Sequence, residues 1–328
     1  MLGLGTRLTD SGSKGGTSMS RRLAALVLAL ACCASGAQAE SWQVPQPYMI
    51  PLPPTIEPNF EVGLRYWASE GKTSITNAGS RLSYDDLNGN SGEFVWSARN
   101  AANTFAKGFV GGGGVSGGTL DGDASRVGLS ETTSNVDGGG LVYGTIDLGQ
   151  RFTLMDGEKK FFLSPFVGFN FYQESAKAYG ARCSGGVCGA DTVEVPFSTE
   201  VIKNEANWAS LRLGGEARLK LWDRLTLIAD AAFLPVAYVW NEASANLNPE
   251  LGSSPNVESK GTGWGYQIEA EARYDFGTRW SAGAGFRYWY AQVSDGKTDF
   301  VNLEDPRVDL SKLSSKRLGV FGDVSYRF

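Results

Sequence analysis

Long stretches of this sequence alternate strictly between apolar and polar residues. In residues 206–222 (ANWASLRLGGEARLKLW), every leucine has an odd number, and every arginine, lysine and glutamate has an even number. In residues 264–276 (WGYQIEAEARYDF), the aromatic and aliphatic side chains have even numbers and the charged ones odd numbers. Successive side chains point to opposite faces only in a β-strand. The pattern therefore predicts strands with one apolar and one polar face.

These strands are longer than those of ordinary sheets. They exceed the usual five or six residues and reach the nine to eleven that cross a bilayer at a tilt. The same alternation recurs in eight further segments, namely 59–68, 92–99, 104–115, 140–152, 160–172, 225–240, 280–291 and 317–328. About ten strands, an even number, are typical of bacterial membrane barrels. The barrel must be closed, because unpaired strand edges cannot face lipid.

The connections between these segments differ in length. Short turns are predicted at Asn100–Asn103, Met155–Lys159, Trp222–Arg224 and Gly277–Arg279, and long polar stretches occupy 70–80, 116–138, 174–204, 241–262 and 293–315. Outer-membrane barrels have short periplasmic turns and long extracellular loops. We therefore predict an all-β fold: a closed antiparallel transmembrane β-barrel of about ten strands, with its long loops outside the cell.

The chain divides into three predicted parts. Residues 1–39 form a leader and signal peptide, with Arg21 and Arg22 before an apolar stretch and cleavage expected after Ala39. Residues 40–58 are a proline-rich periplasmic segment, and residues 59–328 are the barrel. The final strand ends on Phe328, which resembles the signal that outer-membrane assembly machinery reads. This organisation predicts localisation in the outer membrane of a Gram-negative cell envelope.

Composition excludes several classes of function. The sequence contains no histidine, so serine or cysteine catalysis with a histidine base and histidine-ligated zinc are excluded. The net charge of −5 argues against nucleic-acid binding. Cys183 and Cys188 in CSGGVC favour a short-loop disulfide in an exported protein, over a metal site without further ligands. No cofactor is expected.

Charged side chains on the polar face are predicted to meet inside the barrel. Buried charges must be paired or hydrated, and ten strands enclose only a narrow lumen. We therefore predict a network of ion pairs that blocks the channel, with a small polar conduit as the alternative. The predicted network consists of Arg65, Arg212, Glu216, Arg218, Glu269, Glu271, Arg273, Arg287 and Asp323.

Three segments, 83–99, 107–126 and 139–152, resemble the omptins, a family of outer-membrane aspartyl proteases and adhesins. The likeness covers most of residues 58–328. In omptins, two aspartates of the second extracellular loop face an Asp-His couple from the fourth, and together they activate a water. Asp121 and Asp123 match the first pair, whereas the fourth long loop, residues 242–261, contains neither Asp nor His.

The missing half-site decides the functional hypothesis. A water nucleophile needs a base that titrates near the working pH, and none is evident here. Asp121 and Asp123 are therefore interpreted as solvated acids, a vestigial half-site or weak Ca²⁺ ligands rather than catalytic groups. We expect an omptin-like barrel with a binding, adhesive or envelope-structural function. The expected partners are outer-membrane lipid, lipopolysaccharide and an extracellular ligand at the long loops. An aspartic-type endopeptidase using Asp121 and Asp123 and a small passive channel remain the alternatives.

Overall fold

The computed structural model describes residues 59–77, 80–124, 129–183, 194–301 and 307–328. The predicted leader, the proline-rich segment and Cys188 lie outside these residues, as does the side chain of Cys183. The strands are β1 (Asn59–Asn77), β2 (Ser80–Arg99), β3 (Thr104–Ser116), β4 (Thr119–Ala124), β5 (Leu129–Gln150), β6 (Phe152–Asp156), β7 (Lys160–Cys183), β8 (Val195–Trp222), β9 (Leu225–Ala245), β10 (Val257–Asp275), β11 (Trp280–Phe300) and β12 (Arg307–Arg327). A 3₁₀ helix, Pro249–Leu251, lies between β9 and β10.

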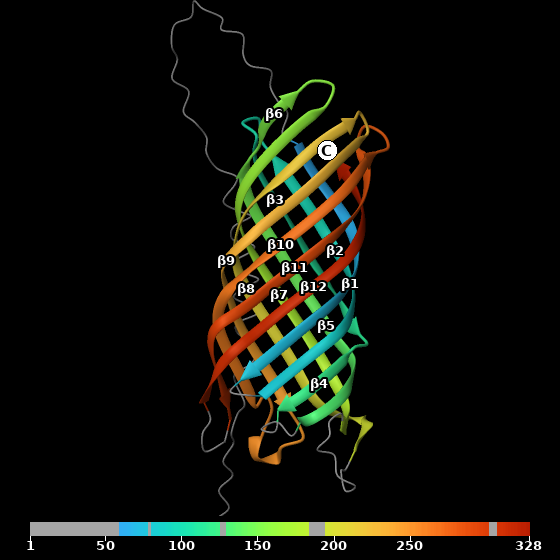
Figure 1. Cartoon of the computed structure of the whole chain (residues 1–328). Coiled ribbons are helices and arrows are strands. Elements are labelled where there is room, and N and C mark those ends of the chain that lie inside the picture. The colour runs from blue at the N-terminus through green and yellow to red at the C-terminus, as the bar shows by residue number, and fades with distance from the viewer. Residues whose placement is uncertain (1–58, 78–79, 125–128, 184–193, 302–306) are drawn as a thin grey trace, which may run out of the picture. The chain divides into compact units, whose positions relative to one another are not determined.

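The strands form one closed antiparallel ring (Figure 1). Ten of them make the ring, and β1 pairs with β12 to close it, with Glu61 opposite Arg327 and Arg65 opposite Asp323. The two remaining strands extend their neighbours in the chain: β4 continues the line of β3, and β6 that of β5. The break between β3 and β4 falls at Gly117 and Gly118, whose φ values of +73° and +123° favour glycine. The predicted ten-stranded closed barrel is confirmed.

One half of the barrel carries an apolar outer belt. On β1, Phe60, Leu64 and Tyr66 point outward, and Leu64 is 71% exposed. Aromatic side chains border the belt at two levels, as in the girdles of membrane barrels. At one level Tyr266 and Tyr290 lie 5.3 Å apart, and at the other Trp280 and Tyr326 lie 4.9 Å apart, between ring centroids. We call the strand segments behind this belt, such as 59–68 of β1 and 318–327 of β12, the membrane half.

The four predicted short turns all lie at the end of the membrane half. They connect β2 to β3, β6 to β7, β8 to β9 and β10 to β11, as the sequence predicts. Because short turns face the periplasm, the opposite end of the barrel is extracellular. Among the described residues, no helix is long and apolar enough to span a membrane.

Beyond the belt, the structure differs from the long loops expected from the sequence. Strands continue through much of 70–80, 116–138, 174–204, 241–262 and 293–315, so that β8 reaches 28 residues. In this extracellular half the apolar side chains point inward and form the main hydrophobic core. The core includes Ile75, Leu82, Leu87, Leu120, Val136, Ile202, Val239, Val257, Val293 and Leu313. The alternation persists there with its faces exchanged, and bulges such as the one between Gly71 and Thr73 interrupt it.

Candidate functional site

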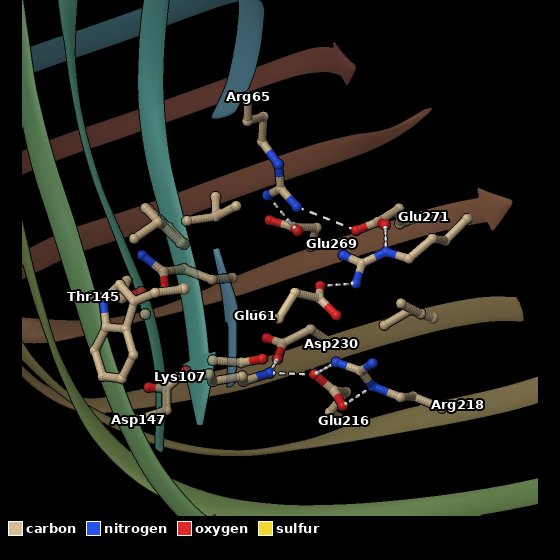
Figure 2. Close-up of a pocket in the computed structure, with 18 of the residues that line it drawn as sticks. Glu61, Arg65, Lys107, Thr145, Asp147, Glu216, Arg218, Asp230, Glu269 and Glu271 are labelled. Carbon is tan, nitrogen blue, oxygen red and sulfur yellow. Dashed lines mark hydrogen bonds and ion pairs between the residues drawn. The ribbon is translucent and has the colours of Figure 1, made fainter. Parts of the chain in front are cut away.

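The charges of the membrane half gather on the inward face of the strands. Each lies between outward apolar neighbours, as Arg65 does between Leu64 and Tyr66. All nine residues of the predicted network point into the lumen, where they join charges that were not in that set. Figure 2 shows part of this cluster, with side chains from different strands pointing toward one another. We define the lumen charge network as Glu61, Arg65, Glu93, Lys107, Asp147, Arg212, Glu216, Arg218, Asp230, Glu269, Glu271, Arg273, Arg287 and Asp323.

Arg65 and Arg287 link four strands, β1, β2, β10 and β11, through two glutamates. Arg65 Nη1 donates to Glu269 Oε1 at 2.7 Å, and Arg287 Nε donates to the other oxygen of Glu269, also at 2.7 Å. Arg287 Nη1 reaches Glu93 Oε1 at 2.5 Å, and the Tyr143 hydroxyl donates to the same oxygen at 2.7 Å. Arg287 is fully buried, so water does not solvate its charge, and these carboxylates balance it instead.

Arg273 joins this group to the periplasmic end. Its Nε donates to Glu271 Oε1 at 2.6 Å, and its Nη1 donates to Glu61 Oε1 at 2.5 Å. Asp323 is held less directly: its Oδ1 lies 3.9 Å from Arg65 Nη2, beyond hydrogen-bond distance. The network therefore brings all these charges together, but it pairs Asp323 loosely.

A second group surrounds Lys107 on the other side of the lumen. Lys107 Nζ donates to Glu216 Oε2 at 2.7 Å and to Asp230 Oδ2 at 2.5 Å. Arg218 also donates to Glu216, and Arg212 lies 3.4 Å from Asp147 and 3.3 Å from Asp230. Sequence reasoning missed Lys107. The sequence could have indicated it, because Ala106, Gly108 and Val110 occupy alternate positions on the outer face of β3. Position 107 between them therefore faces inward.

An aromatic layer closes the lumen above the charges. We define it as Trp67, Phe109, Tyr143, Tyr172 and Trp289. The ring of Trp289 lies 5.0 Å from that of Trp67, 5.1 Å from that of Tyr143 and 5.4 Å from that of Tyr172. The Arg287 guanidinium lies 4.3 Å from the Phe109 ring centroid, a cation–π distance. The layer separates the charged lumen from the apolar core of the extracellular half.

A cavity of about 100 Å³ remains within the network. Lys107, Asp147, Arg212, Glu216 and Gln267 contribute to its wall. Gln267 Oε1 and Arg212 Nε have no hydrogen-bond partner among the described residues. A polar cavity of this size with such atoms in its wall suits several ordered waters. The arrangement can hydrate and pair charges, and Lys107 donates hydrogen bonds to the Glu216 and Asp230 carboxylates in its wall.

A further buried ion pair lies just beyond the membrane half. Arg317 Nη2 donates to Glu174 Oε2 at 2.5 Å, and the same oxygen accepts from the Tyr172 hydroxyl at 2.6 Å. Burial acts to raise the pKa of Glu174, but Arg317 and the hydrogen bonds outweigh it, so this pKa lies below its usual range. Gly71 and Gly89 leave the space that the guanidinium fills, because a Cβ at either would meet Arg317. Sequence reasoning missed this pair, since it expected a loop at Glu174.

The two aspartates matched to the omptin site lie elsewhere. On β4, Leu120 and Ala124 point inward, and Asp121 and Asp123 are exposed on the outer surface. Asp121 Oδ1 accepts a hydrogen bond from Thr133 Oγ1 at 3.1 Å. The strands β9 and β10, which carry the acids of the fourth long connection, lie on the opposite side of the ring. The structure therefore does not bring these groups together across the mouth of the barrel.

No metal centre is evident in the described part of the chain. There, no group of three or more Cys, Asp or Glu side chains is arranged to hold a metal ion. Asp121 and Asp123, which sequence spacing left open as weak Ca²⁺ ligands, thus have no third acidic ligand among these residues.

Comparison with known proteins gives a likeness of fold. No family model and no curated protein matches the sequence. Among solved structures, the outer membrane protease OmpT from Escherichia coli matches with a TM-score of 0.58 and 11% identity, covering 84% of this chain and 98% of that one.

Two further barrels match more weakly. OprG from Pseudomonas aeruginosa has a TM-score of 0.35 at 11% identity, over 83% of this chain and 95% of its own. The toluene transporter TbuX from Ralstonia pickettii has 0.34 at 12% identity, over 82% and 88%. At these scores the two carry no argument about this chain. The closed ring, its apolar belt and the likeness in fold to OmpT together identify the chain as a β-barrel of the outer membrane.

Proposed function

We propose that this protein is a non-enzymatic, non-conducting barrel that holds a binding or adhesive surface away from the outer membrane. The observation that carries the proposal is the filled extracellular half, with its apolar core inside and polar side chains outside. A filled barrel is stiff because its interior is closely packed. Such a half is suited to present its outer wall and loops to a partner rather than to pass a solute.

The side chains that fill the lumen support the proposal that the barrel does not conduct. Its charges pair with one another, the aromatic layer lies above them, and the extracellular core lies above that layer. A solute on the barrel axis would have to displace all three. This favours an envelope-structural or presenting function over the channel.

The direction of Asp121 and Asp123 supports the absence of proteolysis. Peptide hydrolysis needs an activated water held between facing groups, and these two exposed carboxylates point away from the barrel axis. OmpT is a protease, so an endopeptidase is the activity that this proposal must exclude.

The outer wall suggests what kind of partner would bind. Four exposed carboxylates lie on the neighbouring strands β2, β4 and β5, and we call them the acidic strip: Asp86, Asp121, Asp123 and Asp137, with Arg81 opposite Asp123. Such a surface attracts basic partners and binds them less strongly as salt rises. Lys203, Lys260 and Lys297 are proposed to approach lipopolysaccharide phosphates, and Lys260 lies opposite Lys297 across the β10–β11 pair.

The test uses one refolded preparation for three measurements. In planar bilayers we expect no conductance steps, and with a peptide library no cleavage above background. A lysine-rich peptide should bind the barrel in nanodiscs. Replacing the acidic strip by asparagine (D86N, D121N, D123N and D137N) should weaken that binding about tenfold at low salt.

A matched variant controls for total charge. It removes four acids from the opposite wall (E205Q, E242Q, E258Q and D295N) and should bind nearly as well as the unmodified barrel. Reproducible conductance would contradict the proposal, as would cleavage that D121N abolishes. If both variants bound the peptide equally weakly, the acidic strip would not be the binding surface.

A further inference from the structure

A small pocket lies inside the extracellular half, toward its outer end. It has a volume of about 40 Å³, and side chains from β1, β2, β4, β8, β9, β10, β11 and β12 line it. Apolar groups form most of the wall, with Ile75, Leu82, Ile202 and Val257 among them. Space of this size holds roughly three or four water-sized groups.

One buried hydrogen-bond acceptor in this wall has no partner. Asn241 is 2% exposed, and its Nδ2 donates to Asn204 Oδ1 at 2.9 Å. Its Oδ1 accepts no hydrogen bond from any residue that the structure describes. An amide oxygen buried without a donor is costly. The pocket therefore offers one unsatisfied acceptor next to apolar side chains.

Three other polar side chains at this level are linked by hydrogen bonds. Ser259 Oγ and Thr298 Oγ1 are 2.8 Å apart, and Thr298 Oγ1 lies 3.2 Å from Asn77 Oδ1. Among the described residues, no charged side chain lines the pocket, in contrast to the charged wall of the cavity in the membrane half. Since a charged ligand would be buried there without a counter-charge, the pocket selects an uncharged one.

We propose that this pocket binds a small uncharged aliphatic molecule, or the end of one, that carries a single hydroxyl donor. The hydroxyl donates to Asn241 Oδ1, and the carbon chain packs against Ile75, Ile202 and Val257. A short-chain alcohol has the required size and polarity. The site lies apart from the acidic strip, so it stands or falls independently of the proposed function.

The test follows methyl NMR signals of Ile75, Ile202 and Val257 in the full barrel in nanodiscs. Titration with 1-propanol should shift these three signals in a saturable way in the millimolar range. Propionate has the same carbon skeleton but a charge, and it should not shift them. Asn241→Val removes the acceptor and should weaken 1-propanol binding about fivefold, whereas the exposed Asn135→Val should leave it unchanged.

Ala243→Leu provides a second variant, because Ala243 lines the pocket and the larger side chain fills it. It should abolish the saturable shifts even if Asn241→Val does not fold. Absence of saturable shifts with 1-propanol in the unmodified protein would overturn the proposal. Equal shifts with propionate, or persistence of the shifts in Ala243→Leu, would also overturn it.

Discussion

The two halves of this barrel are formed by the same strands but place their apolar and polar side chains on opposite faces. In the membrane half the outside is apolar and the inside is charged, as Leu64 and Arg65 illustrate on β1. Ten residues further along that strand, Ser74 points outward and Ile75 is buried inside. Apolar side chains are favoured on the outer face where lipid surrounds the barrel, and on the inner face where water surrounds it. The solvent outside the wall thus decides which face of each strand is apolar.

The aromatic layer marks where the faces exchange. Below it, ion pairs hold the strands together from within, and above it, apart from the Arg317–Glu174 pair, hydrophobic packing does so. The comparison predicts that the two halves fail for different reasons. Loss of an inward charge should destabilise the membrane half, and loss of side-chain volume in the core should destabilise the extracellular half.

The largest effect is expected from Arg287→Met in the membrane half. The change leaves Glu93 and Glu269 buried with fewer counter-charges, which costs about 3–5 kcal/mol when one partner of a buried pair is removed. Urea unfolding in lipid vesicles, followed by tryptophan fluorescence, measures the loss. Arg307→Met is the control, because its pair with Asp299 is exposed and is worth less than about 1 kcal/mol. If both variants lost the same free energy of unfolding, the lumen charge network would not stabilise the membrane half as proposed.

Packing in the extracellular half is tested by Leu120→Ala. Leu120 is fully buried in the core, and such a truncation typically costs about 2–5 kcal/mol through lost contacts and the cavity left behind. The same change at the exposed Leu154 of β6 should stay within about 0.5 kcal/mol. If Leu120→Ala were equally harmless, the extracellular half would not be a packed core.

A third test places one charge on the same face of β1 in each half. Leu64→Arg puts a guanidinium into lipid and should cost about 2–4 kcal/mol. Ser74→Arg points into water and should change stability by less than about 0.5 kcal/mol. Unfolding in vesicles of both variants checks this contrast. A large cost at Ser74 would mean that lipid reaches that level.

The smallest effect concerns acid. The pKa of Glu174 is lowered in the folded chain, so the folded state binds its proton later than the unfolded chain does as pH falls. Stability from Glu174 is therefore fully present above its ordinary pKa of 4.5 and is lost as pH falls through the lowered pKa of the folded state. The urea midpoint of the unmodified barrel should fall more between pH 5 and pH 3 than that of Glu174→Gln. Parallel curves would contradict the pairing with Arg317.

The membrane half was accessible to sequence reasoning because its pattern is simple. Apolar residues such as Phe60 and Leu64 recur at every second position, and charges such as Glu61 and Arg65 occupy the places between them. A lipid-facing belt requires this spacing over the whole span. The ten segments, their turns and the inward direction of the charges follow from it.

The extracellular half was missed because its outer face is polar, as that of a loop would be. Residues such as Glu70 and Lys72 on β1 are typical of a solvated loop. The bulge opposite them adds one residue to β2, so that the inward positions of β2 change from odd numbers, as at Leu87, to even numbers, as at Leu82. The partners of each charge also depend on which strands meet across the lumen. Arg287 and Glu93 are 194 residues apart, and no local pattern connects them.

Backbone hydrogen exchange tests the central claim most directly. If the strands continue as a packed barrel beyond the lipid, amides at residues 72–76 of β1 and 201–208 of β8 should be protected nearly as well as those at 61–66 of β1 and 212–218 of β8 in the membrane half. Exchange within seconds in those two segments, beside protected amides in the membrane half, would show mobile loops there and contradict the account.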